Sequence, residues 1–423
     1  MTKPLDEMSQ KRRNLRFHYI EGSLYMASLG ILNVQTVYPS LVRRLGGSDI
    51  AIGLLPVIAF GVYLLPQILG ANYASRDPLR RAFVLRLGLL QRLMILLLGV
   101  SVALLGAGIP SLALTVFFVA FTVTQILSGL VAPAWFDFLT KTIPPGMRGR
   151  LLGLRSSTGG LLSVLSSLFL TAAFAHLPFP ESYALVFAIA FLWQISSWFV
   201  LRKVVETEPS HVQAPLPLIA LAAKIRGILA AHASYRRFLI ASALSTVGLM
   251  GAAFFMVAAL EQSALEDSAV GLFTTIAVGS QVVSALALGW LGDRFGYRSP
   301  LLVCSGAMVA ATTLALVGQG LWTWYPVFAL TGITVGAEMV SRFNFAVDCA
   351  PDHERALFVG VLNAWLAPWY LTNIAAGWIG ESFGYGPLFV IGVTFAVAGF
   401  VALTRVKDPR RDQTTNSLAL SSK

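Results

Sequence analysis

The sequence is a succession of long apolar runs separated by short polar segments, and this pattern restricts the chain to one class of fold. Of its 423 residues, 56% are hydrophobic and 12% are charged, whereas about 25% of residues are charged in an average soluble domain. So few charges cannot cover the surface of a soluble protein of this size. The runs therefore predict an all-α integral membrane protein, because a spanning helix needs about 20 apolar residues.

Twelve runs are long enough to be transmembrane helices. They do not alternate polar and apolar residues, as membrane-spanning strands do, so helices are expected throughout. The first run is long enough for a full span and is expected to remain as an uncleaved anchor. The predicted spans are 18–40, 50–72, 83–106, 111–139, 153–175, 183–201, 237–260, 269–291, 300–318, 324–348, 357–379 and 386–404.

The distribution of lysine and arginine predicts the orientation of the spans. If the N-terminus is cytoplasmic, the cytoplasmic tails and loops hold 27 of the 31 Lys and Arg residues, and the outer loops hold only Arg43 and Arg44. Cytoplasmic loops of membrane proteins carry such an excess, so both termini are expected in the cytoplasm. The net charge of +11 is then matched by the anionic lipid leaflet, and no nucleic-acid partner is expected.

The longest polar interval divides the chain into two halves. Residues 202–236 form a predicted cytoplasmic linker between an N-terminal six-helix bundle, 1–201, and a C-terminal six-helix bundle, 237–405, which is followed by a tail, 406–423. Within the linker, the basic stretch Leu218–Ala230 fits two interpretations. It is either an amphipathic helix on the membrane surface or a plain tether.

Short segments at matching places in the two halves resemble each other. Aligning the segment after the second span with the segment after the eighth places Arg76 on Arg294 and Arg80 on Arg298. Such correspondences indicate an internal repeat.

A second correspondence follows the fourth and tenth spans. Asp137 and Arg148 are eleven positions apart after the fourth span, and Asn344 and Arg355 are eleven apart after the tenth. The recurrence of both features supports two six-helix pseudo-repeats.

These segments resemble motifs of the major facilitator superfamily of secondary transporters. The resemblance implies the twelve-helix fold of that superfamily and transport by alternating access between two halves. Ser75 stands where the first-half loop motif has Asp, and the spacing from Asp137 to Arg148 is longer than in the sugar porters, so no sugar substrate is inferred. The matching residues are Gly289, Asp293, Arg294, Gly296 and Arg298 after the eighth span, and Pro133, Asp137, Pro144, Arg148, Gly149 and Arg150 after the fourth.

Charged residues at the cytoplasmic ends of the spans are candidates for a gate that closes and opens the inner side. Asp293 can cap or pair with a neighbouring helix end, and Asp137 can pair with Arg148, Arg150 or an arginine between spans 2 and 3. The alternative is that these basic loops serve topology alone. The predicted gate residues are Asp137, Arg148, Arg150, Arg76, Arg80, Asp293, Arg294, Arg298 and Arg355.

Ionisable residues within the spans are candidates for the transport path, because charge inside a bilayer is costly. Glu338 and Arg342 are four positions apart in the tenth span and share one helical face. Either Glu338 carries a coupling proton or binds substrate while Arg342 tunes it, or the two form a static pair that fixes packing. Glu21 is interpreted either as interfacial or as facing the cavity, and Arg92 has no identifiable partner in the sequence.

Uncharged polar and aromatic residues within the spans complete the predicted path. Each can bind substrate or make an ordinary contact between helices. They are Asn33, Gln35, Gln125, Gln281, Asn363, Trp365 and Asn373.

The function expected from the sequence is secondary transport rather than catalysis. The chain has no phosphate-binding loop, its five histidines lack metal-ligand spacing, and its two cysteines are not expected to form a disulfide. Neither a metal nor a cofactor is therefore expected. We expect a monomeric, multi-pass protein of the bacterial cytoplasmic membrane.

The transport activity expected is proton-coupled efflux of a small amphipathic compound by antiport. Proton-coupled uptake of a polar metabolite is the alternative. A non-transporting receptor or a membrane-embedded enzyme is a third possibility from a different class.

Overall fold

The computed structural model describes residues 4–67, 69–70, 78–209, 218–263, 268–318, 320–351 and 354–409. Within these ranges the chain is built from helices and turns and contains no strand. It divides into two compact units. Unit 1 comprises Met1–Ser48, Ile58–Pro215 and Leu265–Val278, and unit 2 comprises Asp49–Val57, Leu216–Ala264 and Gly279–Lys423.

Among the described residues, nine helices are long and apolar enough to cross a membrane. The multi-pass membrane protein expected from the apolar runs is thereby supported. The helices that contain Glu21 and Glu338 are not among the nine, so the count of twelve spans and the cytoplasmic termini stay predictions. The nine are Arg81–Leu105, Pro110–Thr142, Arg148–His176, Glu181–Leu201, Ala233–Gln262, Ser268–Phe295, Arg298–Val317, Leu357–Phe383 and Tyr385–Thr404.

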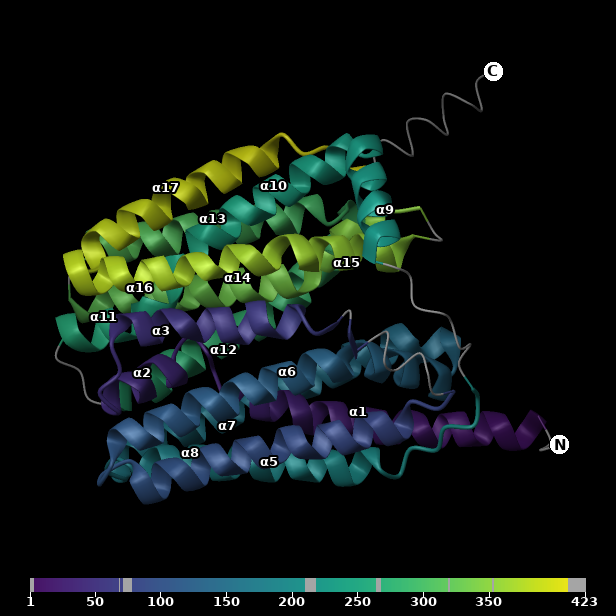
Figure 1. Ribbon diagram of the computed structural model, residues 1–423, viewed down its shortest axis with the longest axis horizontal. Coiled ribbons are helices and arrows are strands. Elements are labelled where there is room, and N and C mark those ends of the chain that lie inside the picture. The colour runs from purple at the N-terminus through teal and green to yellow at the C-terminus, as the bar shows by residue number, and fades with distance from the viewer. Residues whose placement is uncertain are drawn as a thin grey trace. The chain divides into compact units, whose positions relative to one another are not determined.

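Unit 1 is a bundle in which α1 packs on α7 and α8, and α5 packs on α6 and α8 (Figure 1). Small residues bring α1 and α7 together: the Ser163 hydroxyl donates to the Met26 carbonyl at 2.8 Å, and a Cβ on Gly159 would lie 2.5 Å from the Met26 side chain. Close backbone approach of this kind is typical of membrane helix pairs. Its helices are α1 (Pro4–Ile31), α2 (Val37–Arg44), α5 (Arg81–Leu105), α6 (Pro110–Thr142), α7 (Arg148–His176) and α8 (Glu181–Leu201).

In unit 2, α13 packs on α14 and α17, α10 packs on α17, and α3 packs on α16. Glycines allow the contact of α3 with α16, because a Cβ on Gly53 would lie 2.2 Å from the Asn373 carbonyl oxygen. The helices are α3 (Asp49–Pro56), α10 (Ala233–Gly248), η3 (Leu249–Phe254), α11 (Phe255–Gln262), α13 (Arg298–Val317), α14 (Leu321–Asp348), α15 (Arg355–Leu366), η4 (Ala367–Leu371), α16 (Thr372–Phe383) and α17 (Tyr385–Thr404). Helix α12 (Ser268–Phe295) contributes Ser268–Val278 to unit 1 and its remainder to unit 2.

Several predicted spans are interrupted helices rather than continuous ones. The run 18–40 breaks after α1, where the Asn33 side-chain oxygen accepts the backbone N–H of Gln35 and Thr36 before α2 begins. The run 50–72 passes from α3 into a π-helix, η1 (Val57–Val62), directly after Pro56. Proline removes a backbone donor and disturbs the preceding turn, which accounts for the change of helix type.

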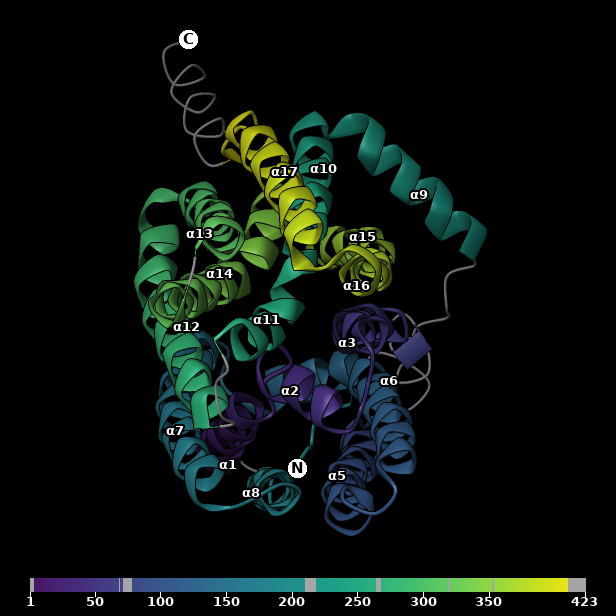
Figure 2. The ribbon, with the colours of Figure 1, turned by 90° about the vertical axis from the view of Figure 1, so that its left-hand side faces the viewer.

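The linker interval 202–236 contains a helix, α9 (Leu218–Ala231). Figure 2 shows that α9 runs across the direction of α10. Its polar residues include Arg226, which is exposed. Both interpretations of this stretch, a helix on the membrane surface and a plain tether, stay predictions.

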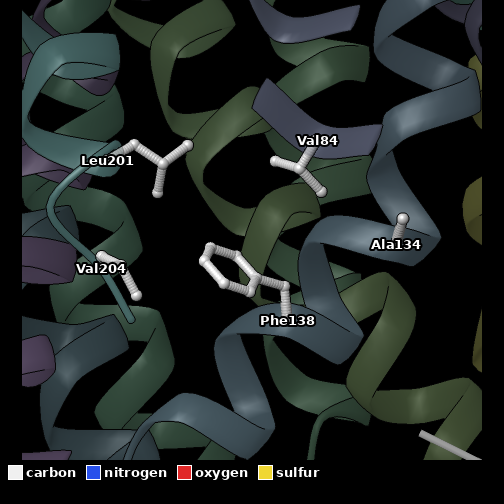
Figure 3. Packing of buried hydrophobic residues seen from close by; sticks show 5 residues of the cluster. All are labelled: Val84, Ala134, Phe138, Leu201 and Val204. Atoms are coloured by element: carbon white, nitrogen blue, oxygen red, sulfur yellow. The ribbon is translucent and has the colours of Figure 1, made fainter. Parts of the chain in front are cut away.

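An apolar cluster lies at the end of unit 1 where α5 begins and α8 ends. Val84, Ala134, Phe138, Leu201 and Val204 are each at most 3% exposed. Figure 3 shows the Phe138 ring among the side chains of the two valines and of Leu201. Two members of this cluster, Val84 and Leu201, also line the cavity described next.

Candidate functional site: a charged cavity in unit 1

Unit 1 contains a half-open cavity of about 420 Å³, lined mainly by α1, α5, α6 and α7 and by the segment around η1. Its volume lies within the range of small-molecule sites, about 300–1,000 Å³. The walls are largely apolar and aromatic, with rings from Tyr25, Phe60, Tyr63 and Trp135. A few polar side chains interrupt them, as is usual in ligand sites: Glu21, Gln91, Arg92, Gln125, Ser128 and Arg155.

Arg92 of α5 is buried and fully engaged with the protein. Its Nε atom donates to the Gln194 carbonyl at 2.6 Å, and Nη1 donates to the Gly88 carbonyl at 2.7 Å. Nη2 donates to the Ser197 hydroxyl at 3.2 Å. These bonds tie α5 to α8, so Arg92 acts mainly as a clamp between two helices.

Arg155 of α7 is equally buried, at 3% exposure, but it makes fewer hydrogen bonds than Arg92. Its Nε and Nη1 atoms have no hydrogen-bond partner in the described part of the chain. The guanidinium lies over the Trp135 ring, 4.7 Å from the ring centroid, a distance typical of a cation–π contact.

Glu21 places a carboxylate in the same cavity from α1, where it is 3% exposed. Oε1 accepts a bond of 3.4 Å from the Ser197 hydroxyl, and Oε2 has no partner within the described ranges. Both guanidinium groups are close enough to interact electrostatically with this carboxylate. Glu21 therefore lines the cavity, which agrees with the second of its two interpretations, and its depth in a bilayer stays a prediction.

The cavity amides bond within the protein. Gln91 donates to the Ser128 hydroxyl at 2.8 Å and to the Tyr25 hydroxyl at 3.2 Å. Gln125 donates to the Ala59 carbonyl at 2.9 Å, which belongs to the widened turns of η1. Gln125 lines the cavity as a predicted path residue would, but its amide nitrogen already holds a neighbouring helix.

The other predicted path residues lie at several places in the fold. The Asn33 side-chain oxygen accepts a backbone N–H in the turn before α2. The Asn373 amide donates to the Tyr370 carbonyl at 3.0 Å. The Trp365 indole donates to the Leu239 carbonyl at 3.0 Å. Gln35, Gln281 and Asn363 are half-buried. The bonds of Asn33, Asn373 and Trp365 support structural contacts at those positions.

In unit 2, Glu338 and Arg342 form the predicted ion pair on one face of α14. Arg342 is 7% exposed, and its guanidinium also donates a hydrogen bond to the Tyr370 hydroxyl. The Glu338 side chain is 24% exposed. Whether Glu338 takes part in coupling stays a prediction.

Two predicted gate residues of the first half, Arg80 and Asp137, meet in a network of charges with Lys141 and Glu206, which were not predicted. The Nε atom of Arg80 lies 2.8 Å from Oδ2 of Asp137. Lys141, one turn along α6, lies 3.7 Å from the same oxygen and 2.6 Å from Oε1 of Glu206. Glu206 also accepts the backbone N–H groups of Arg80 and Arg81 at 2.9 and 2.7 Å, so its carboxylate caps the start of α5.

The remaining gate residues make separate contacts. Arg148 donates to the Thr140 carbonyl at 2.5 Å, and Arg298 donates to the Thr404 carbonyl at 2.7 Å. Asp293 accepts a hydrogen bond from the Tyr297 hydroxyl. Arg294 lies 5.6 Å from the centroid of the Trp290 ring. Arg150 and Arg355 are exposed, and Arg76 lies outside the described residues.

Among the charged residues of the cavity, the sequence pattern missed Arg155. Arg155 follows the basic segment Arg148–Arg150, so it was counted with the cytoplasmic loop, although α7 already begins at Arg148. One signal was present: Arg155 and Glu21 each lie on a helix next to small residues. A Cβ on Gly22 would lie 2.2 Å from Nε of Arg155.

Comparisons with known proteins agree with this helical architecture. The family model described as the Major Facilitator Superfamily matches residues 238–420. Over this part the chain is similar to that superfamily. The subfamily is not identified.

Similar solved structures extend the likeness to the fold of nearly the whole chain. A crystal structure of a mutant of the nucleoside transporter NupG has a TM-score of 0.70 at 11% identity, covering 94% of this chain and 99% of that one. A POT family transporter in complex with 5-aminolevulinic acid also scores 0.70, at 13% identity, covering 93% and 95%. A bacterial homologue of the human lysosomal transporter Spinster scores 0.62, at 17% identity, covering 96% of each chain.

A curated relative gives a local likeness. The niacin transporter NiaP of Acinetobacter baylyi (strain ATCC 33305 / BD413 / ADP1) is 23% identical over 158 residues. This alignment covers 37% of the present chain and 36% of the relative's length. Together the comparisons show that nearly the whole chain has the fold of these transporter structures.

Proposed function

We propose that the chain is a proton-coupled secondary transporter that moves a small solute by alternating access. The observation that supports this most is the carboxylate of Glu21, which is 3% exposed and lines a 420 Å³ cavity with one oxygen unpartnered in the described protein. A buried carboxylate without full hydrogen bonding is costly in its charged form. Binding a proton removes that cost, so Glu21 is suited to carry a proton while the cavity is closed to water.

The ion pair of Glu338 and Arg342 is a second possible coupling element. Its carboxylate is already engaged in an ion pair on its own helix, whereas Oε2 of Glu21 has no hydrogen-bond partner among the described residues. We therefore propose Glu21 as the main proton carrier. Glu338 keeps the role expected from the sequence, coupling or substrate binding in unit 2.

The test is solute movement driven by a pH gradient in proteoliposomes. The wild type is compared with Glu21→Gln and Glu338→Gln. Glu181→Gln is the matched control, because Glu181 is exposed at the start of α8. A panel of dyes, drugs and organic acids is applied with and without an uncoupler. We expect gradient-driven accumulation in the wild type and the control, and its loss in Glu21→Gln.

Two results would contradict the proposal. Accumulation that is insensitive to the uncoupler would remove proton coupling. Gradient-driven accumulation retained in Glu21→Gln and lost in Glu338→Gln would move the proton to unit 2.

The two transport hypotheses differ in the direction of transport and in the class of substrate. Efflux of an amphipathic compound fits the aromatic walls of the cavity. Uptake of a polar metabolite fits the buried, unpartnered nitrogen atoms of Arg155, and a relative named as a niacin transporter supports a small polar solute. The second hypothesis is therefore the better supported by the cavity. Everted and right-side-out vesicles distinguish the two directions, and we propose a monomer in a bacterial cytoplasmic membrane.

A further inference from the structure

We propose that Arg155 binds the carboxylate of a small, flat organic acid within the cavity of unit 1. This inference rests on the proposed function for the movement of that acid across the membrane, but not for its binding. Arg155 is 3% exposed, so its guanidinium is almost wholly removed from solvent. Nε and Nη1 have no hydrogen-bond partner among the described residues.

A buried guanidinium whose N–H groups lack hydrogen-bond partners is costly in a protein interior. The neighbouring Arg92 shows how the same bundle satisfies a guanidinium when its role is structural, because all three of its nitrogen atoms donate to α5 or α8. By contrast, Nε and Nη1 of Arg155 make no hydrogen bond with the described residues. An anionic group brought by a solute would use these donors.

The geometry around Arg155 favours a carboxylate over other acceptors. One face of the guanidinium lies on the Trp135 ring, and Gly22 leaves room for Nε where any side chain would collide with it. The plane of the fork is thereby fixed before a ligand arrives. Each bidentate edge of a guanidinium includes Nε or Nη1, and such an edge matches the two oxygens of a carboxylate.

The rest of the cavity selects the body of the solute. Tyr25, Phe60, Tyr63 and Trp135 supply aromatic surface, which stacks on flat rings. The charged groups of the lining are Glu21, Arg92 and Arg155, so one added carboxylate balances two guanidinium groups and one carboxylate. A flat monocarboxylic acid meets both requirements.

Binding of benzoate and of its neutral isostere benzamide to the purified full-length protein tests the proposal by isothermal titration calorimetry. The wild type is expected to bind benzoate about tenfold or more tightly than benzamide, because only benzoate presents two anionic oxygens. Arg155→Gln is expected to lose this preference. Arg155→Lys is expected to recover part of it, since lysine supplies the charge without the fork.

Two further variants keep the test independent of folding defects. Gly22→Ala retains Arg155 but displaces its side chain, so it is expected to weaken benzoate binding about tenfold or more. Arg86→Gln removes an exposed arginine of α5 and is expected to bind benzoate as the wild type does. Thermal melting of every variant identifies any that is unfolded.

The outcomes separate binding from transport. Equal affinity of the wild type for benzoate and benzamide, or no detectable benzoate binding, overturns the site, as does unchanged benzoate affinity in both Arg155→Gln and Gly22→Ala. Benzoate binding that requires Arg155, without pH-driven movement of any organic acid in proteoliposomes, leaves the site standing and refutes the proposed function.

Discussion

Arg80 and Asp137 form an ion pair, with 2.8 Å between Nε and Oδ2, that joins the residue before α5 to the last turns of α6. The pair lies beside Glu206, whose carboxylate accepts the backbone N–H groups of Arg80 and Arg81 and contacts Lys141. The two acidic residues differ in exposure. The Asp137 side chain is 40% exposed and the Glu206 side chain is 1% exposed, and this difference predicts unequal energetic roles.

Glu206→Gln is expected to destabilise the protein by about 2–4 kcal/mol, because it removes the counter-ion of Lys141 and one charged cap of α5 in a buried place. Asp137→Asn is expected to destabilise the protein less, by about 1 kcal/mol, since the Asp137 carboxylate is partly exposed to water although the Arg80 guanidinium is buried. Thermal or denaturant unfolding in detergent measures both. Equal effects of the two substitutions would contradict this ranking.

Arg92→Gln is expected to destabilise unit 1 by about 2–4 kcal/mol, because the carbonyl oxygens of Gln194 and Gly88 lose their donors. The comparison is Arg155→Gln, which removes two buried donor atoms, Nε and Nη1, that have no partner among the described residues. We expect Arg155→Gln to melt at or above the wild-type temperature. A lower melting temperature for Arg155→Gln than for Arg92→Gln would show that their roles are reversed.

Gly296→Ala is expected to destabilise unit 2 more than Gly320→Ala. Both glycines adopt a positive φ, +89° and +77°, which costs a non-glycine residue about 1–2 kcal/mol. Only at Gly296 would the added Cβ meet another group, lying 2.5 Å from Oδ2 of Asp408. Unfolding curves of the two variants should therefore differ by about 1 kcal/mol, and coincident curves would be inconsistent with this contact.

Cys349 is expected to react slowly with thiol reagents. Burial, with the added effect of the Asp348 and Asp408 carboxylates, raises the pKa of Cys349 to about 12. The thiolate is the reactive form, so its fraction at pH 8 is roughly 1 in 10,000. In a Cys304→Ser background, the rate of N-ethylmaleimide labelling should rise about tenfold per pH unit from roughly pH 7 to 10. A plateau below about pH 9 would show an ordinary pKa.

The pair of Glu338 and Arg342 is expected to show a coupling free energy of about 1–2 kcal/mol in a double-mutant cycle with glutamine at each position. Arg342 is buried, so its isolated charge is costly, but the partial exposure of Glu338 weakens the pair. Chemical unfolding of the four proteins gives this value. A coupling near zero would mean that the pair does not contribute to the packing of α14.

The sequence sufficed to predict features that depend on local pattern. The apolar runs predicted most helices to within a few residues, and the spacing of Glu338 and Arg342 predicted their contact. The breaks after Ile31 and Pro56 were missed because hydropathy is unchanged across them. The altered backbone is stabilised by hydrogen bonds that the Asn33 side chain accepts and the Gln125 side chain donates.

The charged cavity was the main feature that one-dimensional pattern could not locate. Glu21 and Arg155 are 134 positions apart in the sequence and meet only because α1 packs closely on α7. Glycine and serine at that contact are compatible with many helix pairings. The partner of a buried charge is therefore set by tertiary structure, and Arg92 likewise finds two of its three partners on α8.

The segment that follows α8 has a consequence for the order in which the protein can be assembled. Asn14 of α1 exchanges hydrogen bonds with the backbone of Val205, and Glu206 caps α5 from 125 and 126 positions further along the chain. During synthesis the N-terminal helices are made first, yet the start of α5 keeps open amide groups until Glu206 has left the ribosome. A nascent chain arrested just before that point would contain the helices of unit 1 up to α8, but the first backbone N–H groups of α5 would lack their acceptor. Synthesis of Glu206 would supply it.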